Sequence, residues 1–160
     1  MRRRTSLTVS QRSSDLAVPV TEAWRRVAAA TPGSRWYVDA PPFVLRGAID
    51  RALGGAGRRW PLPGRPLLET GDVAGFWRVV EADHEQHRLV LEAAVRAPGR
   101  VRMTTTVTAG GRGTGCTLAQ EIAFEPSGAL GAAYLWADLP AREAVLEVAH
   151  RRAAAEATAT

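Results

Sequence analysis

Histidine is the residue type best suited to hold a metal ion in this sequence, and two of the three histidines are close together. His84 and His87 form a His-x-x-His pair, and imidazole is a common ligand of zinc. A protein zinc site needs at least three ligands, and this pair supplies two of them. We therefore predict no metal site, and we expect both histidines to be solvated on a turn.

Asp138 is the one weak candidate for a catalytic group. A carboxyl turned into an apolar cavity has a raised pKa and can act as a general base. The alternative is an ordinary helix salt bridge with Arg142, four residues along the chain. Neither a phosphate-binding glycine loop between a strand and a helix nor a nucleophile elbow is present, so the catalytic signature is thin.

Two polar residues, Gln120 and Thr105, fall on the apolar side of predicted strands. A buried amide costs about 1–3 kcal/mol unless it forms hydrogen bonds. The pair therefore either orients a ligand in a cavity or is satisfied internally, by each other or by a buried water. The sequence favours neither interpretation.

The elements that position these residues are strands with a period of two. Short loops join the strands after residue 71, which predicts an antiparallel meander with one buried face. The residues expected to be buried are Trp77, Leu89, Leu91, Met103, Val107, Leu118, Ile122 and Phe124. Those expected to be comparatively exposed are Arg78, Glu92, Arg102 and Glu121.

Helical patterns precede and follow the strands. After a first strand at 6–13, in which Leu7 and Val9 alternate with polar residues, helices are predicted from Pro19 and over 42–53. A long helix is predicted over about 128–155, with a kink or break before Pro140. This order predicts an α+β fold of six or seven strands in one domain, 1–160, with 1–5 and 156–160 frayed.

The charge does not indicate a nucleic-acid partner. The formal net charge is +5, but all basic residues are arginines and they are spread along the chain. A nucleic-acid footprint should cluster on one face. No stretch is long and apolar enough for a membrane span, and Met1–Arg4 lacks the apolar region of a signal peptide. We therefore expect a cytoplasmic protein, in keeping with the single cysteine, Cys116.

Several short motifs, in this order, resemble the START-like superfamily, also called helix-grip or polyketide-cyclase-like, and within it an uncharacterised bacterial branch. They are Val18-Pro19 with Trp24, Trp36-Tyr37, Arg46-Gly47 with Asp50-Arg51, Gly54-Gly55, Gly71-Asp72, Phe76-Trp77-Arg78-Val79, Arg88-Leu89, Pro98-Gly99, Leu118 with Gln120, Phe124 with Pro126, and Gly128-x-x-Gly131 with Tyr134 and Pro140. The resemblance implies a curved antiparallel sheet wrapped around a long C-terminal helix, with two short helices after the first strand. Ala94, Val95 and the segment Leu135–Asp138 depart from the branch's pattern.

A helix gripped by a curved sheet leaves space unless large side chains fill it. Small residues stand where filling would be needed, and we predict an apolar pocket of at least ~300 Å³ with no cofactor. Its walls and polar points are predicted to be Trp77, Met103, Thr105, Gln120, Tyr134 and Trp136, and its mouth to lie near Trp36 and Trp60.

The function favoured by this pattern is that of a carrier or sensor of a small apolar molecule. The alternative is a cyclase or isomerase acting on a polyketide-like or other apolar substrate in the same cavity. A third possibility is an interaction module with a collapsed cavity, or an arginine-rich nucleic-acid binder. The oligomeric state is not predicted.

Overall fold

The structure is a computed structural model that describes residues 8–33, 35–52, 54, 63–94, 99–111, 113–126 and 128–159. It describes only the backbone of residues 8, 46–47, 49–50 and 128–141. Statements about side chains therefore concern the remaining residues.

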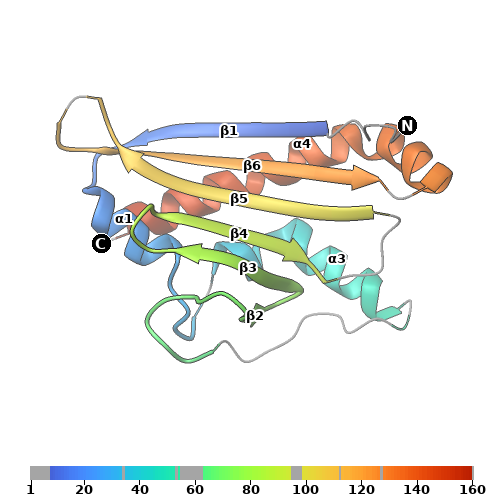
Figure 1. The fold of residues 1–160 in the computed structure, drawn as a ribbon, viewed down its shortest axis with the longest axis horizontal. Helices are drawn as coiled ribbons and strands as arrows, with labels where there is room; N and C mark the ends of the chain where they lie inside the picture. The colour runs from blue at the N-terminus through green and yellow to red at the C-terminus, as the bar shows by residue number, and fades with distance from the viewer. Residues whose placement is uncertain are drawn as a thin grey trace, which may run out of the picture.

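Six strands form one antiparallel sheet in the order β1-β6-β5-β4-β3-β2, with β1 and β2 at its edges (Figure 1). Consecutive strands pair from β2 to β6, and β1 returns beside β6. The strands are β1 (Thr8–Leu16), β2 (Val73–Ala74), β3 (Trp77–Asp83), β4 (Arg88–Ala93), β5 (Gly99–Ala109) and β6 (Cys116–Pro126). The predicted meander and its strand number are confirmed.

The two faces of the sheet divide as the alternation predicts. Every residue expected to be buried is buried, and burial along β6 alternates strictly from Cys116 to Phe124. Gln120 is buried while Glu121 retains exposure, so the predicted register of this strand is correct. A bulge between Val79 and Glu81 shifts the register of β3 and keeps Ala82 opposite Leu89.

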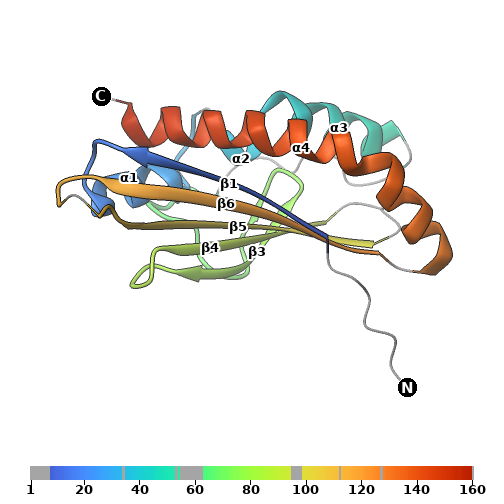
Figure 2. The same ribbon diagram turned by 90° about the horizontal axis from the view of Figure 1, so that it is seen from above.

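The long helix α4 (Gly128–Thr158) lies across β6 and β1 on the concave face (Figures 1 and 2). The helices α2 (Trp36–Asp39) and α3 (Pro41–Ala52) lie on the same face, while α1 (Val20–Val27) lies toward one end of the sheet. The first, orange part of α4 bends away from the axis of its red remainder, as expected for a helix that contains Pro140 (Figure 2).

Helix α2 was not predicted, so three helices rather than two follow the first strand. Its position depends on partners far along the chain. The Trp36 backbone N–H donates to Glu156 of α4 at 2.9 Å, and the Trp36 indole N–H donates to the Val27 carbonyl at 2.9 Å. Four residues are too few to show a helical period, which is why the pattern missed this turn.

The C-terminal helix extends beyond its predicted end and does not fray at residue 156. Glu156 forms an ion pair with Arg35 at 2.8 Å, and Ala157 is fully buried. A second long-range hydrogen bond joins Arg26 of α1 to the Ala157 carbonyl at 3.1 Å. These contacts hold the last turns of α4 against α1 and α2.

Candidate functional site

Polar residues of the edge strand β1 contact polar residues of α4. We call this set the polar seam: Ser10, Arg12 and Ser14 of β1 with Arg142, Glu143, Glu147 and His150 of α4. These three strand residues point toward α4, while the apolar Val9 is 39% exposed on the opposite face. The strand thus turns its polar residues inward. Apolar residues would pack the interior between β1 and α4 without polar contacts. The inward polar residues therefore make the polar seam a candidate for function.

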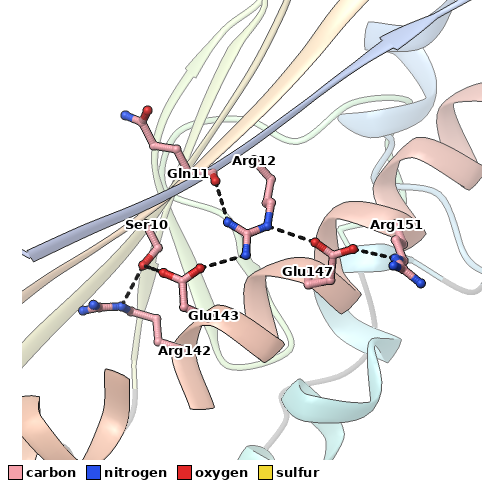
Figure 3. A network of polar contacts seen from close by, with 7 residues as sticks. All are labelled: Ser10, Gln11, Arg12, Arg142, Glu143, Glu147 and Arg151. Atoms are coloured by element: carbon pink, nitrogen blue, oxygen red, sulfur yellow. Dashed lines mark hydrogen bonds and ion pairs between the residues drawn. The ribbon is translucent and has the colours of Figure 1, made fainter. Parts of the chain in front are cut away.

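Arg12 lies at the centre of the seam and binds two carboxylates of α4 (Figure 3). It donates to Glu143 at 2.8 Å and to Glu147 at 2.9 Å, and Glu147 also accepts from Arg151 at 2.6 Å. The hydrogen bond from Ser10 and then that from Arg12 lower the pKa of Glu143. The hydrogen bonds from Arg12 and then Arg151 lower the pKa of Glu147. Both carboxylates are therefore ionised and already paired.

Among the described residues that are buried, Arg142 is the only arginine, lysine, aspartate or glutamate, and its exposed fraction is 5%. Its Nε donates to the Ser10 hydroxyl at 3.1 Å, while its Nη1 has no hydrogen-bond partner in the described part of the chain. Within that same part, no carboxylate lies at ion-pair distance from Arg142. A cation in this environment is incompletely compensated.

Gln120 and Thr105 satisfy each other in part. The Gln120 amide donates to the Thr105 hydroxyl at 3.1 Å, as one of the two predicted interpretations requires. The amide oxygen Oε1 of Gln120 is buried and has no partner among the described residues. One acceptor therefore remains free on the inner face of β6.

The indole N–H of Trp77 on β3 is likewise buried without a partner in the described residues. Its ring packs edge-on against Phe43 of α3, with 5.4 Å between ring centroids, and tilted against Phe76 at 4.7 Å. Two aromatic neighbours fix the ring, so the orientation of its donor is set by packing.

His150 is the remaining buried polar residue on α4. Its Nε2 is 2.8 Å from the Ser14 hydroxyl, and its Nδ1 has no partner among the described residues. Burial lowers the pKa of His150, and the Arg12 charge acts in the same direction. The imidazole is therefore neutral near pH 7.

The concave face is packed in its middle and more open toward one end. Met103 and Thr105 have no accessible surface, so no space large enough for water borders them. Ala93 and Val101, which share the concave face with Trp77 and Phe124 through the strand register, are only partly buried. A ligand would therefore find space at the end of the concave face that carries Ala93 and Val101.

Two hollows of about 380 Å³ each lie on the opposite, convex face of the sheet. Two of the arginines that line them form ion pairs: Arg88 with Glu81 at 2.8 Å and Arg102 with Glu92 at 2.9 Å. Glu121, which lines both hollows, accepts from the Gln11 amide at 2.7 Å. Polar groups of these hollows therefore already have protein partners. The convex face is therefore a weaker candidate than the concave one.

The structure corrects two predicted placements. Trp36 does not lie in a loop: it is in α2, 1% exposed, and its indole N–H is hydrogen-bonded within the core, while its role at a cavity mouth remains a prediction. His84 and His87 are not simply solvated, because both rings pack against Trp24, and Trp24 donates to His84 at 3.2 Å. In the described residues no group of three potential metal ligands comes together.

Four predicted site residues cannot be placed. Trp60 lies outside the described residues, and for Tyr134, Trp136 and Asp138 only the backbone, within α4, is described. The roles of these four residues, including that of Asp138 as a base, remain predictions.

Ser10, Ser14 and His150 were not predicted as site residues from the sequence, and Arg142 was considered only as a partner for Asp138. The sequence feature that could have indicated these residues is that β1 carries polar residues on both of its faces. Their partners on α4 lie more than 130 residues away, so no local pattern connects them.

Solved structures share this architecture. Truncated norcoclaurine synthase from Thalictrum flavum has a TM-score of 0.54 and 12% identity, with 100% of this chain and 99% of that chain covered. The Zhui aromatase/cyclase from Streptomyces sp. R1128 has a TM-score of 0.53 and 12% identity, covering 96% and 98%. A protein from Nitrosospira multiformis has a TM-score of 0.56 and 10% identity, covering 95% and 97%. The chain therefore has the helix-grip fold, a curved antiparallel sheet around a long C-terminal helix, that these structures share.

Within that fold class the family is also defined. A family model described as a protein of unknown function (DUF2867) matches residues 5–149, and the chain belongs to this family. None of the curated proteins compared matches the sequence. In the described part of the chain, no helix combines the length and apolar character needed to cross a membrane.

Proposed function

We propose that the protein binds a small, mainly apolar molecule between α4 and the concave face of the sheet, as a carrier or sensor. The observation that carries the proposal is a set of four buried polar atoms without partners in the described residues. They are Trp77 Nε1, Gln120 Oε1, Arg142 Nη1 and His150 Nδ1.

Unpartnered buried polar atoms are rare in folded proteins, and each costs about 1–3 kcal/mol. All four belong to residues that lie on β3, on β6 or on the sheet-facing side of α4. A ligand whose entry displaces the side chains packed around these atoms can pair with them and recover this cost. A few polar points in an otherwise apolar space are typical of a small-molecule site.

The fold supports the same proposal. Two of the similar structures are described as a synthase and an aromatase/cyclase, so this architecture can enclose an organic substrate. Fold alone does not transfer an activity, and the cyclase or isomerase alternative requires a proton-transferring group such as Asp138. We further propose a cytoplasmic location, in which the buried, unpaired Cys116 would remain reduced.

Filling the proposed space tests the proposal. Binding of the neutral fluorescent probe N-phenyl-1-naphthylamine should be saturable in the wild type. Ala93→Phe should weaken it about tenfold or more, because the new ring occupies the partly open end of the concave face. Ala123→Phe is the matched control. Ala123 lies on the opposite, convex face of the sheet, so its substitution should leave binding unchanged.

Circular dichroism would verify that both variants fold, and native mass spectrometry would detect a molecule that co-purifies with the wild type. Equal probe binding by wild type and Ala93→Phe would place the site elsewhere. Absence of both probe binding and a co-purifying molecule would refute the proposed function.

A further inference from the structure

We infer that the bound molecule is an organic anion, an apolar body bearing a carboxylate, and that Arg142 pairs with that carboxylate. The inference rests on the proposed function and adds the chemical class of the ligand. It is carried by one buried guanidinium and by the arrangement of the groups around it.

The first step is that Arg142 lacks hydrogen-bond acceptors for part of its guanidinium group. A guanidinium has five N–H donors in a planar fork and retains its charge at any physiological pH. The structure gives it one hydrogen bond, from Nε to the Ser10 hydroxyl at 3.1 Å, and leaves Nη1 buried without a partner in the described residues. Nη1 can therefore donate to an acceptor supplied by a ligand, and the buried positive charge favours an anionic acceptor.

The second step is that Glu143 and Glu147, the neighbouring carboxylates whose side chains are described, are already engaged. Glu143 accepts from the Ser10 hydroxyl through one oxygen and from Arg12 through the other. Glu147 is bound by Arg12 and Arg151. The pKa of Glu143 is lowered first by these hydrogen bonds from Ser10 and Arg12 and also by the charge of Arg142. Neither Glu143 nor Glu147, however, accepts a hydrogen bond from Arg142. The seam thus neutralises Arg12 and leaves Arg142 without an ion pair in the described chain.

The third step is the direction in which Arg142 points. Its guanidinium lies on the opposite side of Ser10 from Arg12 (Figure 3). Along β1 that side leads toward Thr8, which pairs with Phe124, and Phe124 in turn pairs with Val101. This is the end of the concave face at which Val101 and Ala93 retain accessible surface. The free donor therefore faces the space in which the ligand is proposed to lie.

The fourth step is the distance across the sheet. Trp77, with the second free donor, lies on β3, and β3 is four strand spacings from β1. At about 4.8 Å per spacing the two strands are roughly 19 Å apart. Between them the inner face presents the apolar residues Ile122, Val101 and Ala93. An elongated apolar body with its carboxylate at the Arg142 side fits this arrangement.

Competition with a matched pair of ligands tests the inference. Decanoate and 1-decanol have the same chain and differ in charge, and each would displace N-phenyl-1-naphthylamine from the wild type at pH 7.5. Decanoate should bind more tightly than 1-decanol by about tenfold to a hundredfold, the range of a hydrogen bond to a charged group. Arg142→Gln should abolish this preference and leave the affinity for 1-decanol within about threefold of the wild type.

Two further variants make the result specific. Arg142→Lys keeps the charge but lacks the planar fork, so it should retain part of the preference. Arg152→Gln removes an exposed arginine ten residues further along the same helix, outside the polar seam, and should retain all of it. If Arg142→Gln does not fold, the comparison of wild type with Arg142→Lys decides the question.

The possible outcomes separate the two proposals. Binding of the neutral probe with equal affinity for decanoate and 1-decanol would overturn the inference and leave the proposed function intact. A preference for decanoate that survives in Arg142→Gln, or in Arg142→Lys without any reduction, would also overturn the inference. Failure of the wild type to bind any of these molecules would overturn both proposals.

Discussion

Single side chains in this protein show where packing is complete and where it is not. Gln120 is 1% exposed, and its amide N–H₂ donates to Thr105, but its oxygen is left without a described partner. The neighbouring inward residues Leu118 and Ile122 are apolar and buried. A leucine in place of Gln120 would avoid the cost of an unpaired acceptor. Glutamine therefore costs stability at this position, which is consistent with its proposed role as a polar point of the ligand site.

His150 gives the protein a predictable response to pH. Burial lowers its pKa, Glu147 opposes this effect and Arg12 adds to it, so the folded state binds a proton less readily than the unfolded state. Stability is then complete above the unfolded pKa of 6.5 and falls as the pH drops from there toward the folded pKa. One proton can contribute at most about 1.4 kcal/mol per pH unit.

We predict that the free energy of unfolding, measured with urea, decreases between pH 7.5 and pH 5.5 more in the wild type than in His150→Gln. Glu156 has a pKa raised chiefly by burial and contributes a slope of opposite sign, but it is present in both proteins. The difference between the two slopes therefore isolates His150. Parallel pH dependences would show that His150 does not titrate differently on folding.

At the scale of elements, the strands were predictable because each carries its own signal. Alternation from Leu118 to Phe124 and in β5 fixes which face is buried, and the short loops fix the antiparallel order. Helix α2 and the end of α4 were not predictable, because Trp36 and Glu156 hold each other from distant parts of the chain. Local patterns specify an element, whereas its partners are set by the tertiary fold.

The candidate site was predicted only in part for the same reason. The side of a strand that faces inward can be read from alternation, and the buried positions of Gln120, Thr105 and Trp77 were predicted in this way. The seam depends on which strand α4 crosses, and the pairing of Ser10 with Arg142 cannot be read from either segment alone. What the sequence did offer was an edge strand whose inner residues are polar.

The junction of β1 and β6 depends on a close backbone approach at Gly115. A Cβ added at this residue would overlap the Leu16 carbonyl oxygen, which cannot rotate away as a side chain could. We predict that Gly115→Ala lowers the free energy of unfolding by about 1–3 kcal/mol, the usual cost of overpacking. Chemical denaturation of the purified variant measures this change.

Gly111→Ala is the control, since nothing lies within 4 Å of an added Cβ at that position in the same hairpin. It should change stability by no more than about 1 kcal/mol, in the stabilising direction through the unfolded chain. Equal effects of the two substitutions would show that the close approach at Gly115 does not limit the junction.

At the scale of the molecule, one sheet presents two surfaces of different character. The convex face carries arginines and glutamates that pair with each other, such as Arg88 with Glu81, so its charges are compensated locally. The concave face is covered by α2, α3 and α4 and contains the four unpartnered polar atoms (Figure 2). The buried polar atoms without partners in the described residues thus lie between helix and sheet, where the ligand is proposed to bind.

A ligand enclosed there must stabilise the whole domain, because it binds the folded chain and not the unfolded one. At a free concentration one hundred times its dissociation constant, N-phenyl-1-naphthylamine should contribute about 2.7 kcal/mol. For a domain of this size each kcal/mol raises the Tm by about 2–4 °C, so we predict a rise of roughly 5–10 °C by circular dichroism. The rise should continue with the logarithm of probe concentration and should be absent in Ala93→Phe. Saturable fluorescence without any rise in Tm would mean that the probe binds the unfolded chain as well, and the enclosed site would have to be abandoned.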